Sequence, residues 1–252
     1  LGAVSVTGHD AYREPFEPLV PGVSFAQYND LDSVKALVTD KTCAIILEPL
    51  QGEGGIHAAT EEFMKGIRKL CDEEGILMIC DEVQCGMGRT GAMFAWQAYD
   101  IKPDIMSMAK AIGSGIPVGA FAMTEEVAKY SLEPGDHGTT YGGNPLACTA
   151  VSKTIEIFEK KHLVEHVQKV GAYLTKKLEE LVEEYDTVKA VKGKGLMQGI
   201  QVTKPISEIT GAALKEGLLI IGAGSDVIRF VPPLIIELEQ VDEMIRILKK
   251  AL

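Results

Sequence analysis

The chain has 252 residues, of which 46% are hydrophobic and 24% are charged, so it can bury a core and is not expected to be disordered. Its net charge of −11 disfavours a nucleic-acid partner or an anionic membrane surface, and no apolar run of about 18 residues predicts a spanning helix. Five scattered cysteines predict buried thiols in a reducing, cytoplasmic compartment rather than disulfides. We predict no metal site, because no cluster of His and Cys has the spacing of a metal-binding motif.

The first half of the chain alternates strand-like and helix-like runs. Thr60 is the predicted N-cap of a helix that extends to about Asp72, and Gly75 is expected to end it. Short apolar runs predict four buried strands, at 43–47, 75–80, 104–109 and 118–123. Strands that alternate with helices are typical of an α/β fold with a mostly parallel sheet flanked by helices.

The second half predicts a smaller α+β domain. Long helices are expected over 144–160 and from there to about 184, and further helices over 206–216 and from 240. Strands are predicted at 188–191, 199–202, 218–221 and 227–230. We therefore expect residues 1–150 to belong to a large domain and residues 151–252 to a small C-terminal domain.

Ionisable residues follow three successive predicted strands, where each strand ends. Glu48, Asp81 and Lys110 are separated by 33 and 29 residues, and each spacing fits one strand-helix-strand step. Parallel strands place such ends along one edge of the sheet, where α/β proteins bind ligands. A polar residue at the start of a loop would explain Glu48 or Asp81 alone, but three ionisable residues predict a shared crevice.

Lys110 lies among small apolar residues, which predicts partial desolvation of its side chain. Desolvation favours the neutral amine, which can attack a carbonyl group to form a Schiff base. Pyridoxal phosphate (PLP) would use both Lys110 and Asp81, since its aldehyde condenses with lysine and its ring nitrogen needs a carboxylate partner. From these residues alone, an aldolase that uses the lysine without a cofactor remains open.

Five stretches occur in an order that resembles the class III, or ornithine-type, PLP-dependent aminotransferases of PLP fold type I. The resemblance covers essentially the whole chain. The stretches are Glu48-Pro-Leu-Gln-Gly-Glu-Gly-Gly55, Asp81-Glu-Val-Gln-Cys-Gly-Met-Gly-Arg-Thr-Gly91, Ala109-Lys-Ala111, His137-Gly-Thr-Thr-Tyr-Gly-Gly-Asn-Pro145 and Ile228-Arg-Phe-Val-Pro-Pro233.

The resemblance implies a set of cofactor-binding residues. Lys110 would form the Schiff base with PLP and carry the proton, and Asp81 would pair with the ring nitrogen. Val83 would pack on the ring, and Gln84 would bind its phenolic oxygen. Glu82, between Asp81 and Val83, is also expected to be a cofactor-binding residue. Thr140 would reach the cofactor phosphate of a neighbouring subunit, which implies a homodimer with shared sites.

The resemblance also implies a substrate-binding set. Arg229 would bind a substrate carboxylate, Glu53 would pair with Arg229 and swing away from it, and Thr139 and Glu48 would line the substrate side. Without this resemblance, an arginine in the apolar strand at 227–230 is either exposed on an edge or paired with an acid. Glu53 could equally lie in a flexible glycine-rich turn.

The implied reaction transfers the δ-amino group of N-acetylornithine to 2-oxoglutarate, a step of arginine biosynthesis. Ornithine, succinylornithine and 4-aminobutyrate stay open as donors, and so do an aminomutase of the same fold and a catalytically silent chain. Family members begin with a longer part that holds a phosphate-binding loop and a ring-stacking aromatic residue. Leu1 is expected to follow that part, and the chain alone is expected to bind PLP weakly or not at all.

Overall fold

The computed structural model describes residues 1–252, which divide into two compact units, Leu1–Cys43 and Ala44–Leu252. The first unit contains only short helices, and Asp30 caps the last of them by accepting a hydrogen bond from the Ser33 N–H at 2.9 Å. These helices are α1 (Gly2–Ser5), α2 (Asp10–Arg13), the 3-10 helix η1 (Glu14–Phe16) and α3 (Leu31–Lys35).

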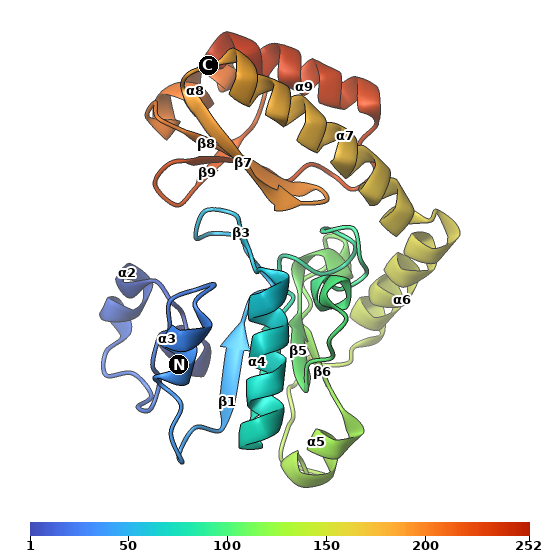
Figure 1. Cartoon of the computed structure of the whole chain (residues 1–252). Coiled ribbons are helices and arrows are strands. Elements are labelled where there is room, and N and C mark those ends of the chain that lie inside the picture. Colours follow the sequence, from blue (N-terminus) through green and yellow to red (C-terminus); the bar gives the residue numbers. More distant parts are fainter. The chain divides into compact units, whose positions relative to one another are not determined.

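The second unit contains a four-stranded sheet in the order β1-β4-β5-β6 (Figure 1). The strands are β1 (Ala44–Leu47), β4 (Leu77–Asp81), β5 (Ile105–Met108) and β6 (Ala120–Met123). The first three are parallel, which confirms the mostly parallel sheet, but β6 runs antiparallel to β5. A parallel neighbour needs a long crossover, whereas the segment between β5 and β6 holds only the 3-10 helix η3 (Lys110–Gly113).

Helix α4 (Glu61–Glu74) connects β1 to β4 and confirms the predicted helix, with two further residues at its end. The Thr60 hydroxyl accepts a hydrogen bond from the Phe63 N–H at 3.1 Å, and Gly75 ends the helix with φ of +66°. Met64 and Ile67 are fully buried on its inner face. This helix makes the crossover that places β1 and β4 side by side.

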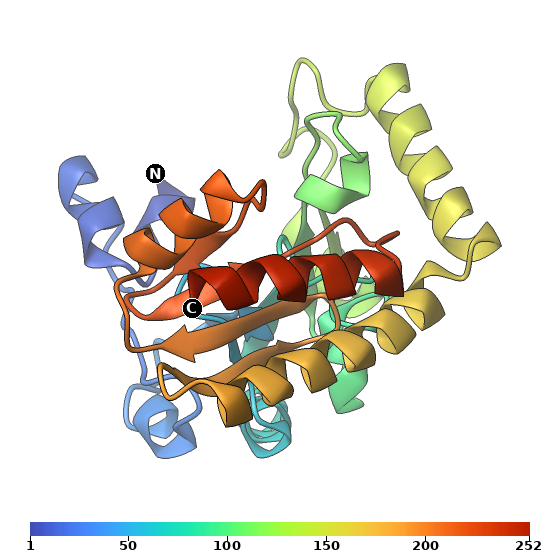
Figure 2. The same ribbon diagram turned by 90° about the horizontal axis from the view of Figure 1, so that it is seen from above.

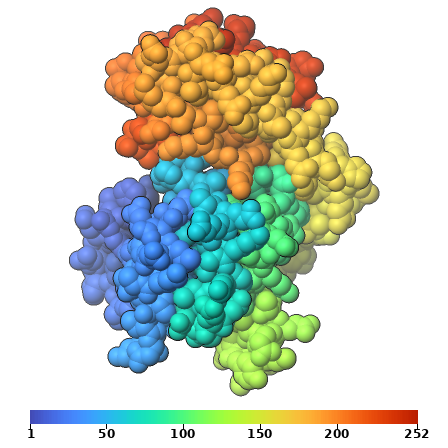
Figure 3. Space-filling view, in the orientation of Figure 1, coloured from blue at the N-terminus to red at the C-terminus, as the bar shows by residue number.

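A second sheet has the strand order β7-β8-β10-β9, and all its pairs are antiparallel. Its strands are β7 (Val188–Lys194), β8 (Met197–Val202), β9 (Ile221–Ala223) and β10 (Val227–Phe230). Helices α7 (Leu163–Glu184), α8 (Ile206–Lys215) and α9 (Leu238–Ala251) accompany it (Figure 2). These C-terminal elements, orange to red in Figure 3, gather in one body of the molecule and confirm the α+β prediction.

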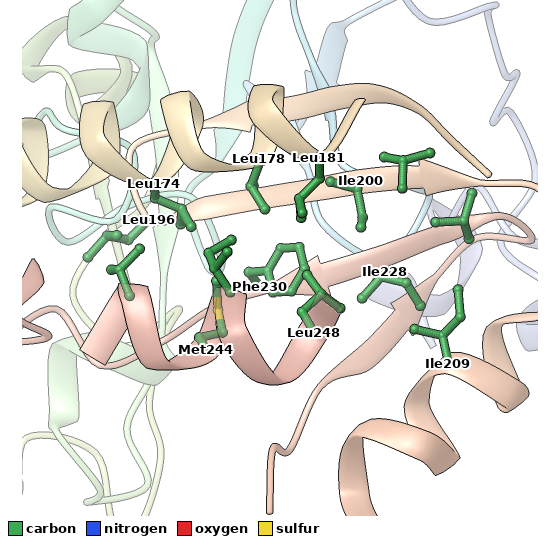
Figure 4. Packing of buried hydrophobic residues seen from close by; sticks show 14 of the residues in the cluster. Leu174, Leu178, Leu181, Leu196, Ile200, Ile209, Ile228, Phe230, Met244 and Leu248 are labelled. Atoms are coloured by element: carbon green, nitrogen blue, oxygen red, sulfur yellow. The ribbon is translucent and has the colours of Figure 1, made fainter. Parts of the chain in front are cut away.

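The core of this C-terminal body lies between the sheet and its helices (Figure 4). Leu174 and Leu178 of α7 pack there with Ile200 of β8 and with Ile228 and Phe230 of β10. Successive side chains of a strand point to opposite faces, so Val227 and Arg229 lie on the other face of β10. Val227 is buried there in a separate apolar cluster.

That other face meets a short hairpin which the sequence pattern did not reveal. The hairpin pairs β2 (Leu50–Gln51) with β3 (His57–Ala58), and strands of two residues are too short to show alternation. Leu50 and Ile56 of the hairpin pack with Val227 of β10 in one buried cluster. The hairpin therefore carries the residues between its strands to the C-terminal sheet.

The remaining elements are η2 (Ala95–Tyr99), α5 (Glu125–Ser131) and α6 (Pro145–Lys160). The predicted domain boundary near residue 150 falls within α6 and stays a prediction. All five cysteines are free thiols; Cys71, Cys80 and Cys85 are buried as expected, whereas Cys43 and Cys148 are exposed. None of the helices combines the length and the apolar character that crossing a membrane requires.

Candidate functional site

The three predicted strand ends lie along one edge of the first sheet. Glu48 follows β1, Asp81 ends β4 and Lys110 follows β5, and these three strands are parallel neighbours in that order. The charges of Asp81 and Lys110 both act on the carboxyl group of Glu48. The structure thus brings together the three residues that the spacing predicted.

Asp81 is held by two hydrogen-bond donors. Its Oδ1 accepts from the Val83 N–H at 2.9 Å and from the Ser107 hydroxyl at 3.0 Å. Ser107 is the register partner of Asp81 on β5, so the sheet itself places this hydroxyl. Both contacts use the same oxygen, Oδ1.

Lys110 has a backbone conformation that is uncommon for a residue with a side chain. Its φ is +48°, and such positive φ values cost energy and cluster at functional sites. The expected desolvation of Lys110 is wrong for this structure, because its side chain is exposed. Its small neighbours Ala109 and Ala111 are too short to cover a four-carbon side chain.

Glu48 has a half-buried carboxyl group whose Oε2 accepts a hydrogen bond from the Gly52 N–H at 3.2 Å. Burial raises the pKa of Glu48 to about 7, and the charge of Asp81 adds to this effect. The Gly52 N–H and the charge of Lys110 act in the opposite direction. A carboxyl group with this pKa can hold or release a proton near neutral pH.

Glu53 and Arg229 form an ion pair at the tip of the hairpin. Nη1 of Arg229 donates to Oε1 of Glu53 at 2.8 Å, and Nε2 of Gln84 donates to the same oxygen at 3.2 Å. The hydrogen bond from Arg229 is the main reason that the pKa of Glu53 is lowered. The pairing of Glu53 with Arg229 that the resemblance implied is therefore present.

Of the two readings left open for Arg229, the structure supports the paired one. Its strand β10 lies between β8 and β9, and its side chain is only 7% exposed, whereas that of Glu53 is 60% exposed. Nε of Arg229 is buried without a hydrogen-bond partner. The cation is thus fixed in the sheet, and the carboxylate that pairs with it is the accessible member.

The hairpin tip is fastened to the C-terminal sheet close to this pair. The Gly224 N–H, between β9 and β10, donates to the Glu53 carbonyl at 2.9 Å. A Cβ at Gly52 would lie 2.5 Å from Oε1 of Gln84, so a larger residue there would displace the Gln84 side chain. These contacts explain how residues 176 positions apart in the sequence form an ion pair.

Glu82 has a structural role in this site, and its role toward a cofactor stays a prediction. Its carboxylate is buried, and its oxygens accept from the N–H groups of Ala95 and Trp96, both at 2.9 Å. Burial raises its pKa, and these N–H donors oppose that shift. A buried carboxylate at the start of η2 fastens the loop after β4, because exposed N–H groups at a helix start attract an acid.

The remaining predicted residues lie at the surface. Thr139 and Thr140 are both exposed in the loop before α6, where Asn144 caps the helix by accepting from the Ala147 N–H at 2.9 Å. Val83 follows Asp81 and is half-buried. The roles of these three residues toward a cofactor or substrate stay predictions.

The fold and this site define a class of protein that the comparisons identify. The aminotransferase class-III family matches residues 1–252. An acetylornithine aminotransferase from Methanocaldococcus jannaschii is 46% identical over 248 residues, which are 98% of this chain and 62% of that protein. This chain therefore belongs to the class III aminotransferase family, and it spans about two thirds or less of the length of the curated relatives it matches.

Solved structures agree with this assignment. The ornithine aminotransferase of Toxoplasma gondii superimposes with a TM-score of 0.93 at 29% identity, over 99% of this chain and 61% of that one. An amine transaminase from an uncultivated Pseudomonas species, solved in its PLP-bound form, has a TM-score of 0.91 at 30% identity, over 99% of this chain and 66% of that one. The predicted PLP fold type I is confirmed.

Proposed function

We propose that this protein is a PLP-dependent aminotransferase that transfers the δ-amino group of N-acetylornithine to 2-oxoglutarate, as in arginine biosynthesis. The observation that carries the proposal is the Glu53–Arg229 pair, which lies one hydrogen bond from Gln84 in the loop that follows Asp81. The names of relatives such as the M. jannaschii protein support the choice of donor.

The residues at the strand edge fit PLP. Lys110 provides a primary amine and Asp81 provides a carboxylate, and the two residues lie at the ends of adjacent parallel strands. When bound, PLP supplies an aldehyde for the lysine and a protonated ring that withdraws electrons from the substrate.

Asp81 would hold the proton on the ring nitrogen. A carboxylate beside a heterocyclic nitrogen favours its protonated form, and Ser107 and Val83 fix the direction of the Asp81 carboxylate. The acid is therefore oriented before any ligand arrives.

Lys110 would bind the cofactor and then move a proton at its Nζ. Its exposed side chain is attached to a left-handed backbone position at the start of η3. This position turns the chain directly after β5, so that the amine projects from the strand edge. A flexible side chain of this length can alternate between bond formation and proton transfer.

Glu53 and Arg229 would let one site accept two kinds of substrate. When paired, Glu53 neutralises Arg229, which suits a donor that brings an amino group to this side. When Glu53 moves away, the guanidinium can bind a carboxylate of 2-oxoglutarate through two parallel hydrogen bonds. The exposure of Glu53 and the burial of Arg229 support this assignment of the moving and the fixed partner.

We further propose a homodimer in which Thr140, beside Thr139, reaches the cofactor phosphate of the other subunit. The same region exposes large apolar side chains, which isolated proteins tend to cover. Phe121, Tyr130, Tyr141 and Leu146 are between 45% and 84% exposed. The five free thiols support a reducing, cytoplasmic location.

An ornithine aminotransferase is the second candidate, because the structural likeness to the T. gondii enzyme is high. Assays with N-acetylornithine, ornithine and 4-aminobutyrate, each with and without 2-oxoglutarate, separate these donors. Turnover without the oxoacid would indicate an aminomutase instead.

Titration with PLP tests the central role of Lys110. At PLP concentrations high enough to load a weak site, we expect the wild-type chain to develop the absorbance band of PLP joined to an amine, and Lys110→Ala to lack it. The matched control is Lys102→Ala, which changes another exposed lysine in the segment before β5. If Lys110→Ala keeps the band, the assignment of Lys110 is wrong.

A further inference from the structure

The side chain of one arginine in the loop after β4 binds two segments of the C-terminal sheet. Nη1 of Arg89 donates to the Leu196 carbonyl at 3.1 Å and to the Pro232 carbonyl at 2.5 Å. Leu196 precedes β8, and Pro232 follows β10. One guanidinium therefore joins the segments next to two adjacent strands of that sheet.

The backbone around Arg89 is interlocked with the same sheet. The Leu196 N–H donates back to the Arg89 carbonyl at 2.9 Å. Gly195 has φ of +59°, and a Cβ there would lie 2.6 Å from the carbonyl carbon of Thr90. Nε2 of Gln168 on α7 donates to the Gly91 carbonyl at 2.6 Å. The segment from Arg89 to Gly91 is thus in close contact with the C-terminal body.

The chemistry of this contact calls for arginine. Burial lowers the pKa of Arg89 to about 10, so the charge is kept although the site is unfavourable for it. A guanidinium presents several N–H donors in a rigid plane, whereas a lysine ammonium is a point charge on a flexible chain. Hydrogen bonds to a charged donor are stronger than neutral ones and offset part of the cost of burial.

The positions of the two carbonyls link Arg89 to the substrate side of the site. Pro232 is three residues after Arg229, and Gly199 of β8 is the register partner of Arg229. At its other end, the loop with Arg89 begins at Asp81, and its Gln84 contacts Glu53. A shift of this loop against β8 and β10 would change the distance between the cofactor edge and Arg229.

We infer that Arg89 is a positioning residue for the carboxylate subsite, which fixes Arg229 relative to the loop after Asp81 and so sets the affinity for a dicarboxylate acceptor. This inference rests on the proposed function for its consequence in catalysis. Its structural part, the fastening of the segment after β10 by Arg89, can be tested without turnover.

Hydrogen–deuterium exchange tests that structural part in Arg89→Met and Arg89→Lys. We expect the amides of 227–231 to exchange about tenfold faster in Arg89→Met, with an intermediate rate in Arg89→Lys and an unchanged rate in 77–81. Arg246→Met is the matched control, since Arg246 is an exposed arginine on α9. An unchanged rate in 227–231, or an equal increase in 77–81, would overturn the inference.

Steady-state kinetics of the PLP-loaded protein test the consequence. We expect Arg89→Met to raise the KM for 2-oxoglutarate about tenfold with kcat nearly unchanged, because the loss affects binding rather than chemistry. A KM at the wild-type value despite faster exchange would also overturn the positioning role. If the wild-type protein shows no turnover of 2-oxoglutarate, the proposed function fails, and the exchange experiment still decides the role of Arg89.

Discussion

The strand edge with Glu48, Asp81 and Lys110 and the ion pair of Glu53 with Arg229 are built in different ways. At the strand edge, each residue follows a parallel strand, and the neighbouring strand supplies the Ser107 hydroxyl that holds Asp81. The ion pair instead joins a hairpin tip to a strand 176 residues later. The first arrangement follows from sheet topology, and the second from the packing of a hairpin on another sheet.

We therefore expect the strand edge to carry out the chemistry and the ion pair to select the substrate. Changes at the strand edge should affect every substrate equally, because every substrate would meet the same amine and acid. Changes at the ion pair should affect substrates that present a carboxylate to Arg229 and spare the others. The predictions below test whether the two regions separate in this way.

The largest effect is expected at Asp81. Asp81→Asn keeps the size and the contact with Ser107 but removes the charge, and loss of such electrostatic stabilisation costs about 10²- to 10³-fold in rate. Single-turnover rates should fall to the same extent with N-acetylornithine and with glutamate. The matched control is Asp186→Asn at an exposed turn. A fall with only one of the two substrates would contradict the separation.

The next largest effect is a pH dependence of stability from Glu48. Its folded-state pKa of about 7 lies above the ordinary value of 4.5, so the folded state binds the proton more tightly than the unfolded state. Glu48 therefore adds stability at low pH, and this contribution is lost as pH rises from 4.5 to about 7. The difference corresponds to about 3 kcal/mol.

Glu48→Gln should remove this dependence, because an amide does not titrate in this range. Urea unfolding at pH 4.5 and pH 8 should show that the variant gains stability relative to the wild type at the higher pH. Glu62→Gln, an exposed acid on α4, is the control. A constant difference between variant and wild type at both pH values would show that Glu48 is not a buried titrating group.

A smaller effect is expected at Glu53. Glu53→Gln leaves Arg229 without its paired charge, so donors that bring an α-carboxylate, such as glutamate, should gain about tenfold over N-acetylornithine in kcat/KM. The ratio of the two kcat/KM values is the measurement. An unchanged ratio would show that this pair does not control selectivity.

The smallest effect is expected outside both regions, at the cap of α4. Thr60→Ala removes the hydroxyl that accepts from the Phe63 N–H and should lower the free energy of unfolding by about 1 kcal/mol. Thr60→Ser should restore most of this loss. A change in substrate preference in either variant would mean that the regions are less independent than their structures indicate.

The sequence predicts the strand edge well, because the positions of these residues follow from patterns between near neighbours in the chain. Apolar runs and their spacing place Glu48, Asp81 and Lys110, and Thr60 and Gly75 define the helix between the first two strands. Burial of single side chains is not local information. Lys110 is exposed despite apolar neighbours in sequence, since small residues do not cover it.

Long-range packing set the limits of the prediction. The hairpin of β2 and β3 has strands of two residues, which no periodicity reveals. The resemblance implies nothing about the contacts of Glu82 within the chain, where its carboxylate accepts from the N–H groups of Ala95 and Trp96. Arg89 lies in the stretch 81–91, and nothing in the sequence indicates that its partners are the distant carbonyls of Leu196 and Pro232.

Borohydride reduction of the chain with PLP, followed by peptide mass mapping, tests the central claim most directly. Reduction makes the bond between PLP and an amine permanent, so the modified lysine can be read from the peptide masses. At PLP concentrations high enough to load a weak site, we predict the added mass on Lys110 in the wild type and a loss of specific labelling in Lys110→Ala. Stoichiometric labelling of another lysine, with Lys110 unmodified, would contradict it.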